Sequence, residues 1–153
     1  MINSQIVFAV ISLAAGGGSA VAADPAWYPI GYEAAVDLSS VRKIGHISRV
    51  WTMDILMETD SNGIDYSLRR YEIDCNDRTF LQMSYSAYDI DGVVKSTGDN
   101  RTEKFSVPPG TVISAIADVA CDDEYDADFP PIDDAGAFVE IARRLALSDV
   151  SRR

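Results

Sequence analysis

Two cysteines, Cys75 and Cys121, carry the most distinctive chemistry in this sequence. Three roles are open to them: a disulfide bond, a pair of metal ligands, or a reactive thiol. A structural zinc site needs four ligands at short spacing, and His46 is the only histidine of the chain, so we predict no metal site. In an oxidising compartment two cysteines most often form one disulfide, so the compartment of the protein decides their role.

The N-terminal residues predict export to such a compartment. Residues 6–15 form an apolar run that is too short to span a bilayer, and small residues follow it. The segment Ala20-Val21-Ala22 fits a signal-peptidase site, which predicts a signal peptide over residues 1–22. The competing interpretation is a buried N-terminal segment, since no Lys or Arg precedes the apolar run. No cysteine lies near the cleavage site, so we expect a periplasmic or secreted protein without a lipid anchor.

Export therefore favours a disulfide between Cys75 and Cys121. The bond would close a loop of 46 residues. In the chain-entropy description such a crosslink stabilises the folded state by roughly 4 kcal/mol.

The sequence offers little sign of other catalytic or cofactor-binding motifs. His46 has no marked nucleophile near it in sequence, and neither a phosphate loop nor a dinucleotide fingerprint is present. The segment Asp89-Ile90-Asp91-Gly92 lacks the third ligand and the terminal Glu of a calcium loop, so a hairpin turn is the better interpretation. We predict no cofactor, and these residues lend no support to an enzyme. The alternative is a small periplasmic hydrolase or hydrolase inhibitor, for which a cleft holding a carboxylate of raised pKa would argue.

Charge is spread unevenly along the chain. The formal net charge is −11, and residues 122–134 contribute seven acidic side chains and no basic one. Phosphate backbones are bound by clustered Lys and Arg, so we predict that the protein does not bind nucleic acid.

The elements that position the cysteines centre on residues 69–85, which predict an antiparallel hairpin. Apolar and polar residues alternate in both halves, as in strands with one buried and one wet face. The first half alternates Tyr71, Ile73 and Cys75 with Arg70, Glu72 and Asp74; the second alternates Leu81, Met83, Tyr85 and Ala87 with Gln82, Ser84 and Ser86.

A strand over residues 47–57 and a short amphipathic helix over 111–121 complete the expected domain. The predicted fold is α+β: an antiparallel meander with one helix pinned across it by Cys121.

Residues 122–134 predict an acidic linker, and residues 135–153 a second helix with an apolar stripe. We expect that helix to dock, although presentation to a partner is open. We also expect the core of the domain to close before residue 122.

Four segments, taken in order, resemble the surface-adhesin protein E-like family of bacterial exported proteins. They read DLSSVRKIGHISRVW, RRYEIDCNDRTF, SYSAYDIDGVV and FSVPPGTVISAIADVAC. The resemblance covers roughly Trp27 to Cys121, and thus residues 23–121 as the family's domain. It implies an antiparallel sheet with a C-terminal helix tied by a disulfide between the matching cysteines. It also implies non-enzymatic binding, in named members adhesion to host proteins.

We therefore predict an exported, adhesin-like protein that contacts a protein partner through its sheet. The mixed polar side chains predicted on the exposed face suit such contacts, although ordinary solvated sheet residues would look the same. They are Arg70, Glu72, Gln82, Ser84 and Tyr88. A further hypothesis is a homodimer formed through an unpaired edge strand.

Overall fold

A computed structural model describes residues 24–99 and 101–151 of this chain. The signal peptide predicted over residues 1–22 lies outside the described residues. The predicted linker and second helix lie within them, except for the last two residues of the chain.

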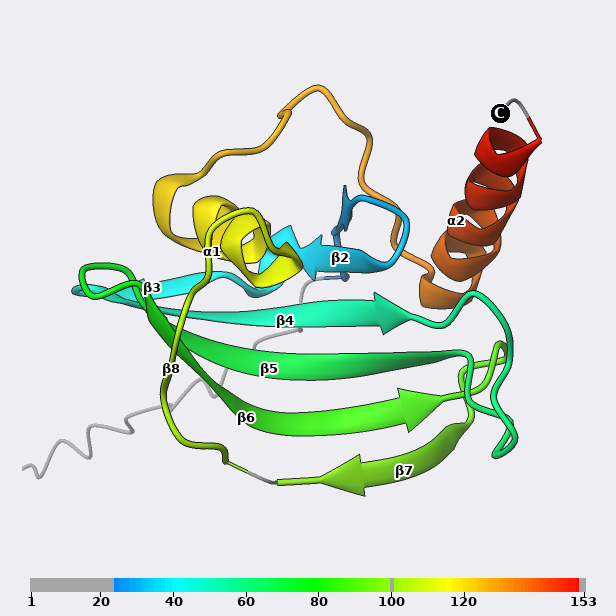
Figure 1. The fold of residues 1–153 in the computed structure, drawn as a ribbon, viewed down its shortest axis with the longest axis horizontal. Coiled ribbons are helices and arrows are strands. Elements are labelled where there is room, and N and C mark those ends of the chain that lie inside the picture. Colours follow the sequence, from blue (N-terminus) through cyan, green and yellow to red (C-terminus); the bar gives the residue numbers. More distant parts are fainter. Residues whose placement is uncertain (1–23, 100, 152–153) are drawn as a thin grey trace, which may run out of the picture.

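The chain forms one antiparallel sheet in the order β1-β2-β4-β5-β6-β7. Two short strands lie off this path, β3 beside β4 and β8 beside β6. The strands are β1 (Trp27–Ile30), β2 (Ala34–Asp37), β3 (Arg42–Ile44), β4 (Ile47–Ile55), β5 (Tyr66–Asp74), β6 (Thr79–Tyr88), β7 (Val94–Gly98) and β8 (Phe105–Ser106). A 3₁₀ turn, η1 (Leu38–Ser40), connects β2 to β3. The predicted α+β fold and its central hairpin, β5 and β6, are confirmed (Figure 1).

Two helices follow the sheet. Helix α1 (Val112–Asp122) begins at Thr111, whose side chain accepts a hydrogen bond from the Ser114 amide, and it ends at Asp123 in the left-handed conformation. Helix α2 (Ala135–Val150) begins at Asp134, which caps the Ala137 amide in the same way. In Figure 1, α2 stands at the end of the sheet where β4 finishes.

The strand register divides the sheet into two faces. Paired residues of an antiparallel ladder share a face, and the faces alternate along each strand. Val50 pairs with Tyr71, and Ser48 with Ile73, on one face. Trp51 pairs with Arg70, and Met53 with Leu68, on the other. We call these the α1 face and the α2 face.

The α1 face carries one of two hydrophobic clusters. Val36, Val50 and Ile73 pack there against the buried side of α1, which includes Ile116 and Val119. The Ser48 hydroxyl donates to the Ala120 carbonyl at 2.8 Å across the same contact.

The disulfide between Cys75 and Cys121 joins the end of β5 to the last turn of α1. The two Cα atoms are 5.6 Å apart. The predicted disulfide is confirmed.

The second cluster lies on the α2 face, at one end of the sheet. Met53, Ile55 and Tyr66 pack there against Phe138 and Val139 of α2. Val139 is fully buried. The expected docking of the second helix is confirmed, but the expectation that the core closes before residue 122 is wrong on this face.

A close approach of backbones fixes the start of α2. A Cβ atom at Gly136 would lie 2.6 Å from the Ile90 carbonyl oxygen. Only glycine therefore lets the first turn of α2 approach the turn between β6 and β7 this closely.

Candidate functional site

Three of the five predicted contact residues lie together on the α2 face. Arg70 is paired with Trp51 on one side and with Ser84 on the other, and Glu72 is paired with Arg49. All three are partly exposed. The structure thus brings Arg70, Glu72 and Ser84 into one patch across the three central strands.

Gln82 lies on the other face because β6 contains a bulge. Tyr71 pairs with Gln82 while Arg70 pairs with Ser84, so Met83 is an extra residue and the alternation of β6 shifts. Gln82 then shares the α1 face with Tyr71 and accepts a hydrogen bond from Arg69 Nη1 at 3.2 Å. The predicted grouping of Gln82 with Arg70, Glu72 and Ser84 is wrong.

Tyr88 lies on the α2 face but at its covered end. Its ring stacks on Tyr66, with centroids 5.1 Å apart and an angle of 11° between the planes. Both rings belong to the contact with α2, since Tyr88 packs against the cluster that contains Phe138. Tyr88 therefore supports the core and is not part of the open patch.

Trp51 is the residue of the patch that the sequence pattern did not reveal. Its place in the apolar alternation of residues 47–57 indicates a core residue, yet it is partly exposed and belongs to neither hydrophobic cluster. Helix α2 covers its neighbours Met53 and Ile55. Arg49 on the same face was the available sign that the buried part of the strand ends before Trp51.

A cleft of about 290 Å³ opens beside Trp51. Its other lining residues come from β6, β7 and the residue that follows: Ser84, Tyr85, Ser86, Thr97, Gly98 and Asp99. Hydroxyl groups dominate this lining. Hydroxyl groups both donate and accept hydrogen bonds, so the cleft suits a polar group.

Ion pairs border the patch. Arg49 and Glu72 approach to 2.9 Å, and Arg101 lies 3.6 Å from the other oxygen of the same carboxylate. The Glu72 side chain is only 13% exposed, and these two arginines are the cations that balance its charge. The patch of Trp51, Arg70, Glu72 and Ser84 thus offers an aromatic ring, charges and hydroxyl groups on a firm sheet, as protein-binding surfaces do.

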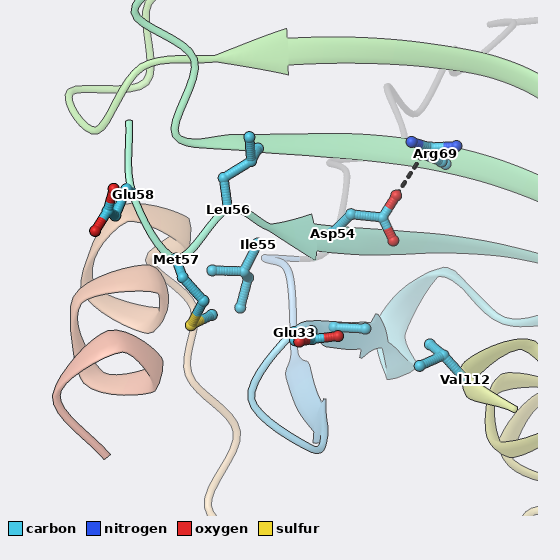
Figure 2. Close-up of a pocket in the computed structure, with 9 residues that line it drawn as sticks. Glu33, Asp54, Ile55, Leu56, Met57, Glu58, Arg69 and Val112 are labelled. Atoms are coloured by element: carbon cyan, nitrogen blue, oxygen red, sulfur yellow. Dashed lines mark ion pairs between the residues drawn. The ribbon is translucent and has the colours of Figure 1, made fainter. Parts of the chain in front are cut away.

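A second depression lies at the end of β4, on the α1 face (Figure 2). It is an open groove of about 550 Å³ that holds three carboxylates, Glu33, Asp54 and Glu58. Its other side chains include Arg69 and three apolar residues, Leu56, Met57 and Val112.

Asp54 is the titrating group of interest in this groove. Burial raises its pKa, while its ion pair with Arg69 acts in the opposite direction. The described residues that line the groove include no Ser, Thr, Cys or His that could act as a nucleophile. The groove therefore has one feature of a hydrolase site, a carboxylate of raised pKa.

Within the described part of the chain, no three His, Cys, Asp or Glu side chains come together in a group that could bind a metal ion. The Asp89 carboxylate accepts hydrogen bonds from the amides of Asp91 and Val93, as the turn interpretation of this segment predicts. Among the described residues no helix has the length and apolar character to cross a membrane.

Comparison with known proteins gives a family and a fold. The sequence profile of the family described as Surface-adhesin protein E matches residues 27–122. No curated protein matches the chain.

Two solved structures of Haemophilus influenzae protein E share its fold. Crystal form II is 15% identical, covers 66% of this chain and 94% of its own, and has a TM-score of 0.52. The other structure is 13% identical, covers 69% of this chain and 89% of its own, and also has a TM-score of 0.52. At this identity the likeness concerns the fold, whereas the profile match over most of the chain concerns descent. This chain belongs to the surface-adhesin protein E family.

Proposed function

We propose that this protein is an exported, non-enzymatic adhesin-like protein that binds another protein through the open part of its α2 face. Membership in a family of surface adhesins supports export and adhesion. The observation that carries the choice of surface is Trp51, an aromatic side chain left partly exposed in the middle of a sheet. Trp and Arg are enriched among the residues that dominate binding energies in protein interfaces.

The position of the patch also suits binding. Trp51, Arg70 and Ser84 lie on three neighbouring strands whose ladders fix their spacing. A partner would therefore meet a preorganised surface and would lose little conformational freedom on its side. In line with the family, the expected partner is a protein of the host.

The experiment is a binding assay on purified extracellular proteins. The mature chain is immobilised and a panel of extracellular-matrix and plasma proteins is passed over it. We expect at least one saturable interaction that Trp51→Ala weakens tenfold or more, since central aromatic anchors contribute about 2 kcal/mol or more.

The matched control is Leu147→Ala, which removes an apolar side chain that is 68% exposed on α2, away from the patch. An interaction that both variants weaken equally, or that neither weakens, would place the contact elsewhere. Melting curves of both variants show whether the fold is intact.

A hydrolase remains the second candidate, because the pKa of Asp54 in the open groove is raised, which is the direction that a general acid requires. Asp54→Asn would abolish turnover of glycoside or ester substrates by the purified protein. Absence of turnover in the wild type across such substrates would remove this candidate.

We also propose that two copies of the chain associate through the outer edge of β7, the last strand in the order of the sheet. Val94 on this strand is 52% exposed. Size-exclusion chromatography at two concentrations tests it, and a monomer at both would contradict it.

A further inference from the structure

Arg70 differs from the other basic side chains that the structure describes. All Lys and Arg residues except Arg152 and Arg153 fall within residues 24–99 and 101–151. Every one of them apart from Arg70 has an ion pair or a side-chain hydrogen bond there. The guanidinium of Arg70 has neither within this part of the chain.

This arginine does not sit at the rim of the molecule. It lies on β5, between β4 and β6, with Trp51 and Ser84 directly opposite. The residue is partly buried. Because its guanidinium has no ion pair or side-chain hydrogen bond within the described part of the chain, it is available to an anion that a partner brings to the patch.

The nearest carboxylate on the same face and strand does not supply that partner. Glu72 is engaged by Arg49 and Arg101, at 2.9 and 3.6 Å. Arg49, Arg70 and Arg101 therefore stand against two carboxylates here, Glu72 and Asp99, although the whole chain carries a net charge of −11. The patch is locally positive, and its charge complements a carboxylate.

We propose that Arg70 binds the carboxylate of an Asp or Glu side chain that a protein partner places against Trp51. This inference rests on the proposed function of the α2 face and names the chemistry of the partner. A guanidinium matches a carboxylate in a two-point contact, and a lysine ammonium does not.

The neighbours of Arg70 complete the subsite. The Ser84 hydroxyl, which lines the cleft, can donate a further hydrogen bond to the bound carboxylate. The Trp51 ring, which lines the same cleft, offers an apolar surface to the methylene groups of the acidic side chain. Asp99 lines the cleft as well and repels a carboxylate, so the acid is held at the side of Trp51 and Ser84.

The first test uses a defined acidic peptide. N-acetyl-pentaglutamate amide is titrated into the labelled protein while the Arg Nε–Hε resonances are recorded by NMR. The Arg70 resonance, assigned by its loss in Arg70→Lys, should shift and saturate. The neutral analogue N-acetyl-pentaglutamine amide should leave it unchanged. No saturable shift, or an equal shift with inorganic phosphate at the same concentration, would overturn the carboxylate assignment.

The second test uses a protein that binds in the panel assay. Arg70→Gln should weaken that binding roughly tenfold or more, and Arg70→Lys should restore part of it. The matched control is Arg144→Gln, which removes the same charge from an exposed position of α2 and should have no effect.

These outcomes separate the two proposals. If Trp51→Ala abolishes binding and Arg70→Gln leaves it unchanged, the carboxylate subsite is wrong while the binding face stands. If the glutamate peptide saturates the Arg70 resonance and no panel protein binds, the subsite stands and the adhesive function loses its support.

Discussion

Arg143 ties α2 to the connection between β4 and β5. Its guanidinium lies 2.9 Å from the Asp65 carboxylate, and its Nε donates to the Leu56 carbonyl at 2.8 Å. The Thr59 hydroxyl donates to the same carboxylate at 2.6 Å. The Asp65 side chain is 4% exposed, so its charge depends on these partners.

Removing the partner of Asp65 should destabilise the protein strongly. We expect Arg143→Gln to lower the free energy of unfolding by about 3 kcal/mol, because a buried carboxylate is left without its cation. The matched control is Arg144→Gln on the same helix, whose exposed pair with Glu140 contributes less than about 0.5 kcal/mol. Urea denaturation of the three proteins at neutral pH measures both values, and equal midpoints for all three would contradict the role of Arg143.

The same pair predicts a pH dependence. Burial alone would raise the pKa of Asp65, but hydrogen bonds from Thr59 and Arg143, together with the charge of Arg143, lower it below 3.8. A carboxylate of lowered pKa stabilises the fold above its unfolded pKa and loses this contribution as the pH falls through the folded value. The stability difference between wild type and Arg143→Gln should therefore be largest near neutral pH and shrink as the solution becomes more acidic. A difference that grows on acidification would contradict this sign.

At the scale of residues, the sequence shows types and alternation but not pairing. The alternation of β5 predicts correctly that Arg70 and Glu72 share a face. The bulge at Met83 leaves no mark in the sequence, since neither glycine nor proline stands near it, and Gln82 is misplaced as a result. The pairing of Asp65 with Arg143 joins residues 78 positions apart and has no local signature.

At the scale of elements, helix α1 is held to the hairpin by several bonds around the disulfide. Arg78, in the turn between β5 and β6, forms ion pairs with Asp118 and with Asp122, the latter at 3.0 Å. The positive φ of Arg78, 50°, belongs to this turn. Lys43 of β3 pairs with Asp123 just beyond the helix, at 2.7 Å. The crosslink thus lies within a contact that three ion pairs also hold.

Opening this crosslink should therefore destabilise the domain without abolishing its fold. We expect Cys75→Ala to lower the free energy of unfolding by roughly 4 kcal/mol, through the greater freedom of the unfolded chain. Circular dichroism should keep its native shape at low temperature, and the melting temperature should fall. The wild type in reductant should melt like the variant, and identical melting of the oxidised and reduced wild type would contradict the prediction.

The helices and strands were the part of the structure that the sequence predicted best. The apolar alternation and the capping side chains of Thr111 and Asp134 are local features, so the hairpin and both helices can be predicted from the sequence. Which face each helix covers depends on the register of β4 and β5, and this is a property of distant pairs.

At the scale of the whole molecule, the sheet is covered on both faces, but unequally. Helix α1 covers one face, while α2 covers only the end of the other that holds Met53, Ile55 and Tyr66. The remainder of the α2 face, around Trp51, is the surface for which we propose a function. The family profile matches residues 27–122, so α2 lies outside that match, although it completes the core.

Removal of α2 should accordingly unfold part of the protein. We expect a chain that ends at Asp134 to expose Met53, Ile55 and Tyr66 and to lose cooperative unfolding, because Phe138 and Val139 no longer cover them. Near-ultraviolet circular dichroism and dye binding measure this loss. The control, Leu147→Ala, changes the same helix at an exposed position and should unfold like the wild type. A truncated chain with a native melting curve would contradict the place of α2 in the core.

The disulfide also has a mechanical consequence. A protein that attaches to a surface is stretched between its attachment points, and its length under load is set by the residues that can be pulled straight. Cys75 and Cys121 close 46 residues into a loop, which includes β6, β7, β8 and most of α1. A fully extended chain measures about 3.4 Å per residue, so this loop corresponds to roughly 150 Å of chain. Tension applied to the two ends of the oxidised chain cannot straighten that length. An oxidised molecule pulled in a single-molecule instrument stays short even after every strand has separated, and a reductant releases the hidden length in one step.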